Sequence, residues 1–208
     1  MGGPQKHCLM KHAADLVFGT SNPNKLKEIR HLIPSSIRLW SMQEVGIDQE
    51  LPEDQDTIAG NAEQKVHELY RLCGKNCFAE DTGLIVEALN GDPGVYSARY
   101  AGPQRSAQDN MDLLLHNLRS KDNRNAHFLT VIALHWEGGL YTFKGIVEGH
   151  IAHQAAGKGG FGYDPIFIPS GYQKSFGELP SHVKNQMSHR ARAVLKLITF
   201  LESHSETR

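Results

Sequence analysis

Residues 15–25 read DLVFGTSNPNK, an apolar strand that passes through a polar loop into a helix. Apolar side chains then recur at helical spacing, at Leu26, Ile29 and Ile33. Asn22 or Ser21 is a suitable N-cap, and Pro23 suits the first turn. A strand followed by a capped helix predicts an α/β chain. The loop can bind an anion at the helix N-terminus, although taken alone it is equally consistent with an ordinary capped turn.

The remaining predicted elements complete the α/β pattern. Further strands are predicted over 36–40, 126–136 and 140–151. Apolar faces predict two more helices, one after Thr57 with Ile58, Ala62, Val66, Leu69 and Cys73, and one after Ser106 with Met111, Leu114, Leu115 and Leu118. The sequence Glu137-Gly138-Gly139 predicts a hairpin between the two long strands. Because strands follow both helices and a hairpin, we predict a mixed sheet.

Composition excludes several classes of protein. The chain has 208 residues and a net charge of −1, which suits a sizeable core and argues against a bulk nucleic-acid binder. Its three cysteines fit neither a disulfide framework nor a zinc knuckle, so we expect reduced thiols in a cytoplasm. No stretch approaches the roughly 20 apolar residues of a membrane span. His150 and His153 resemble a metal pair, but no third ligand lies at a recognisable spacing.

A glycine-rich run over 157–165, GKGGFGYDP, is the most informative segment for function. Its glycines permit a close approach of a ligand to main-chain N–H groups, and Phe161 offers a flat face to a nucleobase. Asp164 precedes Pro165, which favours an extended conformation at the aspartate. Glycines alone would indicate a surface turn. The run has no polar filler and leads into an apolar segment, which favours a binding loop.

Two carboxylates lie together in the run NCFAED over 76–81. We predict a short strand that ends at Glu80 and Asp81, a turn at Thr82 and Gly83, and a resumed strand over 84–86. Two carboxylates at a strand end can hold Mg²⁺ and leave waters for chemistry. A solvated acidic turn is the plainer alternative.

A second acidic segment precedes the helix that Thr57 caps. Residues 51–56 read LPEDQD and supply further oxygen ligands for a metal. On the helix, Lys65 lies one turn from Asn61 and can face the same place. Taken alone, Lys65 is equally a solvated helix charge.

The C-terminal run from Ser181, SHVKNQMSHRARAVLKLITFL, ends in a helix. We expect its core face to comprise Met187, Ala191, Val194, Leu195, Ile198 and Leu201. Lys184, His189 and Arg190 cluster at its start. Cations normally favour a helix C-terminus, so basic residues at the start point to a bound ligand.

These runs together resemble the Ham1-like inosine triphosphatase family of nucleoside triphosphate pyrophosphohydrolases. The resemblance extends from about Asp15 to the last helix. The matching motifs, in chain order, are the loop 20–25, Glu53, Asn61-Ala62 with Lys65, 79–84, 93–100, 159–165 and 188–190. Four positions depart from the family pattern: Ser21 replaces a glycine, Gly60 an acid, Glu80 an aspartate and Thr82 a serine.

The resemblance implies a fold and an activity. The fold is a long, strongly twisted mixed β-sheet with flanking helices that form two lobes around a central cleft. We expect one catalytic domain over 15–203, preceded by a polar extension over 1–14 and followed by a tail over 204–208. The implied activity converts ITP, dITP and XTP to monophosphate and pyrophosphate with Mg²⁺, in a cytoplasmic homodimer that binds neither nucleic acid nor a membrane.

The resemblance also implies the roles of individual residues. Asp81 would activate water, and Mg²⁺ would lie on Glu53 and Asp81, with Glu80 as a further candidate ligand. The triphosphate would lie on Thr20, Ser21, Asn22, Pro23, Asn24, Lys25 and Lys65. Thr82 would contact the substrate, and the base and sugar would lie against Phe161, Gly162, Tyr163, Asp164, Lys184, His189 and Arg190.

Two alternatives have other consequences. A Maf-like pyrophosphatase would prefer other bases, and the Ser188-His189-Arg190 and FGYD motifs argue against it. A non-catalytic nucleotide-binding sensor would not need Asp81, Glu53, Lys25 and Lys65, all of which are present.

Overall fold

The structure, a computed structural model, describes residues 14–205. Its strands are β1 (Ala14–Gly19), β2 (Ile37–Ser41), β3 (Cys77–Val86), β4 (Pro93–Gly94), β5 (Asn125–Trp136), β6 (Gly139–Ile151) and β7 (Phe167–Pro169). Its α-helices are α1 (Pro23–Leu32), α2 (Ile58–Cys73), α3 (Ala107–Asn117), α4 (Ser181–Met187) and α5 (His189–Ser205). Short 3₁₀ turns lie at η1 (Gln43–Val45), η2 (Glu87–Leu89), η3 (Ser97–Arg99) and η4 (Asp164–Ile166). The predicted extension and tail fall largely on residues 1–13 and 206–208, outside the described part.

The strands form one mixed sheet, as predicted. Its order is β2-β1-β3-β5-β6-β7, with β4 paired to β3. The pairs of β1 with β2 and β3 are parallel, whereas β3–β5, β5–β6 and β6–β7 are antiparallel. The hairpin is also confirmed, although Gly139 pairs with Trp136 and belongs to β6. The turn is therefore Glu137-Gly138, both with positive φ (50° and 85°), as a two-residue type I′ turn requires.

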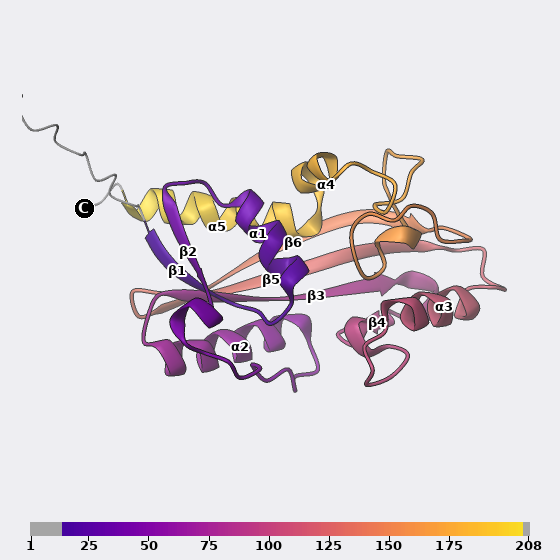
Figure 1. Ribbon diagram of the computed structural model, residues 1–208. Helices are drawn as coiled ribbons and strands as arrows, with labels where there is room; N and C mark the ends of the chain where they lie inside the picture. Colours follow the sequence, from indigo (N-terminus) through magenta and orange to yellow (C-terminus); the bar gives the residue numbers. More distant parts are fainter. Residues whose placement is uncertain (1–13, 206–208) are drawn as a thin grey trace, which may run out of the picture.

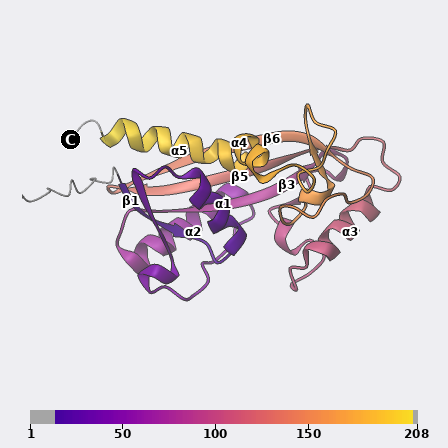
Figure 2. The same cartoon turned by 45° about the horizontal axis from the view of Figure 1, so that its top comes forward.

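Two lobes lie at opposite ends of the long strands β3, β5 and β6 (Figure 1). The first lobe contains β1, β2, α1, α2 and most of α5, and the second contains β4, α3 and the segment 152–180. Figure 2 shows α5 lying along β5 and β6 and α3 at the far end of the sheet. The predicted arrangement of two lobes on one sheet is therefore confirmed. Within residues 14–205 no helix is long and apolar enough to cross a membrane.

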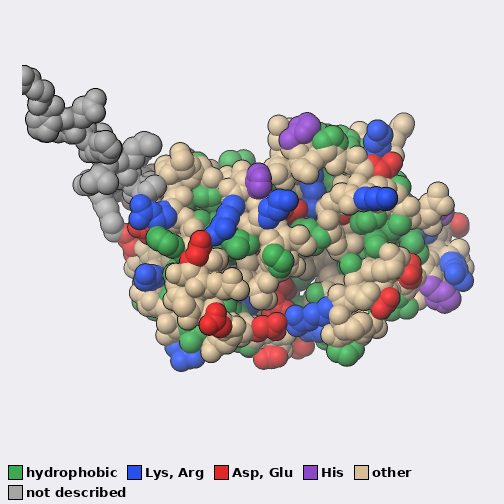
Figure 3. All heavy atoms as spheres, viewed as in Figure 1, with side chains coloured by type: hydrophobic (Ala, Val, Ile, Leu, Met, Phe, Trp, Pro, Cys, Tyr) green, Lys and Arg blue, Asp and Glu red, His purple; other side chains and the backbone are tan. Residues whose placement is uncertain are grey.

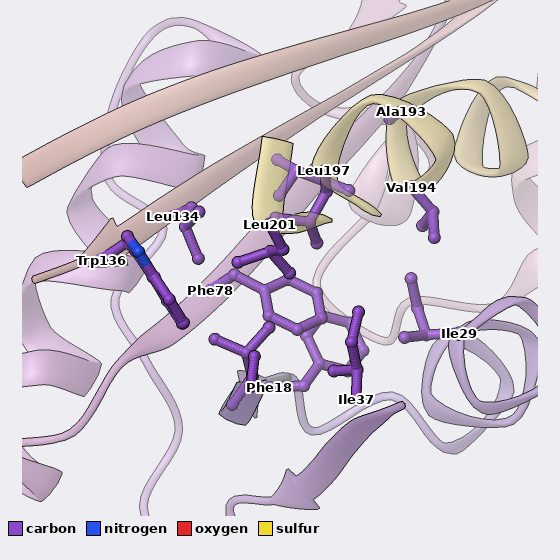
Figure 4. Close-up of a cluster of buried hydrophobic side chains, with 13 residues drawn as sticks. Phe18, Ile29, Ile37, Phe78, Leu134, Trp136, Ala193, Val194, Leu197 and Leu201 are labelled. Atoms are coloured by element: carbon purple, nitrogen blue, oxygen red, sulfur yellow. The ribbon is translucent and has the colours of Figure 1, made fainter. Parts of the chain in front are cut away.

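Successive side chains of a strand point to opposite faces of the sheet, and in the first lobe both faces are apolar. One face packs against α1 and α5, with the rings of Phe18 and Phe78 stacked at 4.6 Å between centroids (Figure 4). Such a stack contributes about 0.5–1.5 kcal/mol beyond its buried area. The other face packs against Ala62, Val66 and Leu69 of α2. A third cluster fills the second lobe under α3.

The acidic run over 76–81 was predicted to end a strand, and this prediction is wrong. β3 continues from Cys77 to Val86 and pairs with β5 at every position, including Thr82 with Thr130 and Gly83 with Leu129. The long partner strand keeps Thr82 and Gly83 extended, so the sequence Thr-Gly does not make a turn here. As a consequence, Glu80 and Asp81 lie in the middle of a strand and point to opposite faces of the sheet.

The C-terminal run contains two helices, because Ser188 interrupts the helical conformation with φ −62° and ψ 159°. Lys184 therefore lies in the last turn of α4, and only His189 and Arg190 begin α5. Leu195 was expected in the core but is 64% exposed, so that prediction is wrong. Gly145 of β6 allows α5 to start close to the sheet, since a Cβ at this position would lie 2.0 Å from the His189 carbonyl oxygen.

Candidate functional site

A cavity of about 370 Å³ lies between the two lobes. Its wall includes every residue predicted for the site except Pro23, which is exposed in the first turn of α1, and Glu80, which is buried. Acidic and basic side chains gather at the edge of the hollow between the lobes (Figure 3). The sequence-predicted residues, which are spread over 20–190, therefore converge on one cavity.

The loop between β1 and α1 has the predicted helix cap. The Asn22 side chain accepts hydrogen bonds from the N–H groups of Asn24 (2.9 Å) and Lys25 (3.3 Å). The N–H of Asn22 in turn donates to Thr20 Oγ1 at 3.1 Å. The loop is thus held in one shape at a helix N-terminus, where the positive end of the helix dipole faces the cavity. Its role in binding an anion stays a prediction.

On the α2 face of β3, Asp81 belongs to a group that we call the open cluster: Glu53, Asn61, Lys65 and Asp81. Lys65 Nζ donates to Glu53 Oε1 at 2.7 Å and to Asp81 Oδ1 at 3.2 Å. Asn61 Nδ2 donates to Asp81 Oδ2 at 3.3 Å. The side chain of Lys65 is 5% exposed, that of Asp81 10% and that of Glu53 30%. The plainer alternatives, a solvated acidic turn and a solvated lysine, are therefore wrong.

Electrostatics keep the open cluster charged. Burial alone would raise the pKa of Glu53, but Lys65, followed by Lys25 and Arg105, outweighs it and lowers that pKa. Burial alone would lower the pKa of Lys65, but Asp81 and Glu53 outweigh it and raise that pKa. At neutral pH the cluster therefore presents an ionised Glu53 beside a protonated Lys65.

On the opposite face, Glu80 belongs to a group that we call the closed network: Glu28, Glu80, Asp164, Lys184 and Arg190. Arg190 Nε donates to both Glu80 oxygens, at 2.9 and 3.0 Å, and Nη1 donates to Glu28. Lys184 Nζ donates to Glu28 at 2.7 Å and to Asp164 at 2.6 Å. The side chains of Glu80 and Arg190 are 0% and 1% exposed. The network joins α1, β3, η4, α4 and α5.

The carboxylates of the closed network differ in pKa. Burial raises the pKa of Glu80, but Arg190 and Lys25 outweigh it and hold the pKa below its ordinary value. Lys25 Nζ lies 3.5 Å from Glu80 Oε1. For Asp164, burial dominates over the pairing with Lys184 and raises the pKa. Of the five N–H donors of Arg190, one on each Nη remains for a ligand after the contacts with Glu80, Glu28 and Thr82 Oγ1 (3.5 Å).

The glycine-rich loop is folded around Asp164. Asp164 Oδ2 accepts a hydrogen bond from the N–H of Phe161 at 2.7 Å, and Gly160 has a φ of 71°, which favours glycine. Asp164 was expected to be extended, but it is the first residue of η4, so this prediction is wrong. Its contacts with Phe161 and Lys184 outweigh the local preference that Pro165 imposes.

Aromatic side chains form one end of the cavity. The Phe161 ring has Lys184 Nζ at 4.9 Å and Arg190 Cζ at 5.5 Å from its centroid. His189 stacks on Phe128 at 4.6 Å, and its buried Nδ1 has no hydrogen-bond partner among the described residues. Burial, then Arg190, Lys184 and Lys25, lowers the pKa of His189 well below 6.5, so the ring is neutral. A neutral ring with an unpaired nitrogen can still bond to a ligand.

Two further predicted residues lie between the two ends of the cavity. The Tyr163 hydroxyl donates to the Ser97 carbonyl at 2.9 Å and so joins the glycine-rich loop to η3. Burial raises the pKa of Tyr163, so its hydroxyl stays neutral. Thr82 Oγ1 lies 2.6 Å from Thr130 Oγ1. Both side chains are thus fixed by protein contacts and line the wall.

Sequence reasoning missed several residues in and behind the cavity wall. Glu28 lies behind the wall and is central to the closed network, and its position one helical turn after Lys25 is a signal that could have identified it. Arg99, Arg105 and Phe128 line the wall itself. No local pattern marks Phe128, because it is one apolar residue in a strand of apolar residues.

The donor set fits a Mg²⁺ ion without forming a complete cage. Among residues 14–205 there is no group of three or more His, Cys, Asp or Glu side chains arranged to hold a metal. Glu53 and Asp81, however, both bond to the one Nζ of Lys65, so their carboxylates face a common point. Mg²⁺ is commonly held by one or two carboxylates together with waters and substrate phosphates.

Comparison with known proteins gives consistent matches. The family model described as the Ham1 family matches residues 16–200. A dITP/XTP pyrophosphatase of Flavobacterium johnsoniae is 49% identical over 186 residues, which cover 89% of this chain and 97% of the relative. A dITP/XTP pyrophosphatase of Bacillus subtilis is 40% identical over 199 residues, 94% of this chain and 99% of the relative. The solved structure of the Staphylococcus aureus Ham1 protein has a TM-score of 0.83 at 36% identity and covers 91% of this chain and 99% of its own.

Proposed function

This chain belongs to the Ham1 family, and from that premise we propose that it is a pyrophosphatase of non-standard purine nucleoside triphosphates. It is a hydrolase that converts ITP, dITP and XTP to the monophosphate and pyrophosphate. The observation that carries the proposal is the single cavity that has a carboxylate–lysine cluster at one end and an aromatic, donor-rich pocket at the other. A nucleotide has the same two ends, a polyanion and a flat base.

The triphosphate lies at the end of the cavity with Lys25 and Lys65. Hydrolysis between the α- and β-phosphorus develops charge on phosphate oxygens, so fixed cations and N–H donors stabilise the transition state. Lys25, Lys65 and the loop from Thr20 to Asn24 supply both. Because Lys65 is already held by Glu53 and Asp81, its position is set before the substrate arrives.

Asp81 accepts a proton from the attacking water. It is the member of the open cluster that is fixed on a central strand, with Asn61 and Lys65 orienting its two oxygens. Glu53 and Asp81 would hold Mg²⁺, which supplies positive charge to the phosphate oxygens when bound. Glu80 is a weaker candidate for the metal, because its two oxygens accept hydrogen bonds from Arg190 in the closed network.

The base lies against Phe161, where Arg190 and His189 contact its edge. Hypoxanthine and xanthine carry a 6-oxo acceptor where adenine carries an amino donor. The remaining N–H donors of Arg190 are satisfied by the 6-oxo group, whereas a 6-amino group would leave donors facing donors. An unsatisfied buried donor costs about 1–3 kcal/mol, which favours the oxo purines over ATP. Gly162, Tyr163, Asp164 and Lys184 shape the pocket.

The proposal also covers the compartment, the oligomeric state and the partners of the enzyme. We expect a cytoplasmic homodimer that binds neither nucleic acid nor a membrane. Cys73 and Cys77 are both free thiols, which fits a reducing compartment. The net charge of −1 fits a small-molecule substrate better than a nucleic acid.

The test is pyrophosphate release from ITP, dITP, XTP, ATP and GTP, with Mg²⁺ and with excess EDTA. The expected result is pyrophosphate release from ITP, dITP and XTP, a kcat/KM for ATP about 10- to 100-fold lower than that for ITP, and loss of activity in EDTA. Equal rates on all five would contradict the assigned base pocket. Binding of ITP with no hydrolysis would favour the sensor alternative, and a preference for other bases would favour a Maf-like enzyme.

A further inference from the structure

Arg105 is a charged residue of the cavity wall that the proposed function leaves without a role. It lies between η3 and α3, in the second lobe, whereas Lys25 and Lys65 lie on α1 and α2 of the first lobe and Asp81 lies on β3, which joins the two lobes. Its guanidinium Nη1 lies 4.0 Å from Glu50 Oε2, on the segment between η1 and α2 of the first lobe. The contact therefore crosses the mouth of the cleft from one lobe to the other.

The pairing of Arg105 differs from that of the other cations of the wall. Lys65, Lys184 and Arg190 each have carboxylates at hydrogen-bond distance and are at most 5% exposed. Arg99, the other arginine that the second lobe contributes to the wall, lies over the Tyr96 ring at 5.3 Å. The Arg105 side chain is 51% exposed, its partner Glu50 is 72% exposed, and 4.0 Å is too long for a hydrogen bond. Such a pair contributes little to stability and is easily exchanged.

Arg105 adopts an uncommon backbone conformation. Its φ is 53°, in the left-handed region that non-glycine residues seldom adopt. The surrounding loop is anchored, because Asn110 Oδ1 accepts the N–H of Ala101 at 2.7 Å and Ser106 caps α3 directly afterwards. A strained residue that its surroundings hold in place is a common feature of ligand sites.

The charge of Arg105 already acts on the catalytic end of the cavity. It contributes, after Lys65 and Lys25, to the lowered pKa of Glu53. A triphosphate placed on Lys25 and Lys65 would lie next to Glu53 and would present several negative oxygens toward the opposite lobe. Apart from Arg99, which is engaged with Tyr96, Arg105 is the arginine of the described second-lobe wall that can meet them.

We infer that Arg105 is a phosphate-binding residue contributed by the second lobe, and that it exchanges Glu50 for the terminal phosphates when the substrate binds. Glu50 then serves only to keep the guanidinium at the mouth of the empty cleft. Arg105 gives the triphosphate a cation on each side, so that a monophosphate, which does not reach across, gains nothing from it. The inference rests on the proposed function for the placement of the triphosphate.

The experiment compares Arg105→Gln with two controls. Arg119→Gln removes the same charge from an exposed position of the second lobe outside the cavity wall. Glu50→Gln removes the partner and leaves the arginine. For each protein, KM and kcat are measured with ITP and Mg²⁺, and calorimetric titration gives the affinities for inorganic tripolyphosphate and for IMP.

The expected result for Arg105→Gln is an approximately 10-fold weaker affinity for tripolyphosphate and a similar rise in KM, the effect of one charge-assisted contact. The affinity for IMP should change less than about two-fold, and both controls should stay within about two-fold in every measurement. Equal losses in Arg105→Gln and Glu50→Gln would overturn the inference, because the pair would then be structural. So would an Arg105→Gln protein that behaves like Arg119→Gln, or a parent that does not bind tripolyphosphate.

These outcomes separate the inference from the function on which it rests. If the parent protein fails to hydrolyse ITP, the proposed function is wrong. The tripolyphosphate titrations still decide the role of Arg105 in that case. If the parent hydrolyses ITP and Arg105→Gln is unchanged in KM and in tripolyphosphate affinity, only the role of Arg105 is lost.

Discussion

Glu80 and Asp81 are adjacent acids on one strand, and the groups around them differ in almost every physical respect. Asp81 lies in the open cluster, where Glu53 is 30% exposed and one lysine joins two carboxylates. Glu80 lies in the closed network, where Arg190 and Glu80 are 1% and 0% exposed and each cation bonds to two acids. Because β3 is continuous, the two side chains point to opposite faces and reach different helices.

The difference separates two tasks. The pair of Glu53 with Lys65, in which the glutamate is 30% exposed, can exchange partners for a phosphate or a metal ion at a smaller cost than a fully buried pair, because water and ligand replace the lost contact. A fully buried network cannot lose a member without leaving an unpaired charge in a medium of low polarity. We therefore assign chemistry to the open cluster and the fixed shape of the base pocket to the closed network.

The largest effect is expected for Asp81→Asn. Asparagine keeps the shape and can still accept a hydrogen bond from Lys65, so the fold should persist. It cannot accept the proton of the attacking water, and loss of a positioned base costs about 10²–10⁴-fold in rate. The measurement is kcat for ITP, with the urea unfolding midpoint of the variant as the control for folding. Activity within a few-fold of the parent would remove Asp81 from the mechanism.

Glu80→Gln should act mainly on stability. Removing one charge from a buried pair costs about 3–5 kcal/mol, because Arg190 and Lys25 lose their shared carboxylate. Urea unfolding at pH 7 measures this cost. The matched control is Glu68→Gln, which breaks the exposed pair with Arg71 and should leave the midpoint nearly unchanged. A Glu80→Gln protein as stable as the parent, yet unable to hydrolyse ITP, would move Glu80 into the catalytic group.

The same variant should change the response to acid. The folded-state pKa of Glu80 is lowered below 4.5, so its ionised form stabilises the fold above that pH. That contribution is lost as the pH falls through the folded-state pKa. The acid side of the stability profile should therefore be flatter in Glu80→Gln than in the parent.

Much of the fold was predictable from local signals. Asn22, Thr57 and Ser106 cap the helices as their residue types indicate, and the apolar face of α2 is buried as its spacing predicts. Two of the errors share one cause, which is tertiary contact. The sequence Thr82-Gly83 resembles a turn, but pairing with β5 keeps it extended. Asp164 precedes a proline, but bonds to Phe161 and Lys184 place it in a 3₁₀ turn.

The candidate site was predictable as a set of residues and not as a geometry. The resemblance to the family supplied most members of the cavity wall. It could not show that Glu80 and Asp81 face opposite sides, because that depends on the continuity of β3. Nor could it show that Glu28 joins Lys184 and Arg190, which lie more than 150 residues away in the chain.

Glu53→Gln tests how far the open cluster depends on a metal. The amide keeps the shape but removes a negative charge that a hard cation would bind. The Mg²⁺ concentration for half-maximal rate should rise about 10-fold, which corresponds to about 1.4 kcal/mol. Asp56→Asn is the control, because it lies in the same acidic segment but outside the cavity wall. An unchanged Mg²⁺ requirement in Glu53→Gln would exclude Glu53 as a ligand.

The smallest expected effect concerns His189, at the border between the base pocket and the closed network. In the folded protein its pKa is held well below 6.5 by burial and by the cations Arg190, Lys184 and Lys25. The unfolded chain takes up a proton as the pH falls through about 6.5, while the folded protein does not, so stability must decrease in that direction. From pH 7.5 to 5.5 the loss from this one group is at most about 1.4 kcal/mol. His189→Asn should therefore show a smaller difference between its urea midpoints at these two pH values, whereas His182→Asn, at an exposed position of α4, should keep the parent's difference. If His189→Asn and His182→Asn behave alike, the His189 ring is protonated in the folded protein. Water would then reach the closed network more readily than its buried ion pairs indicate.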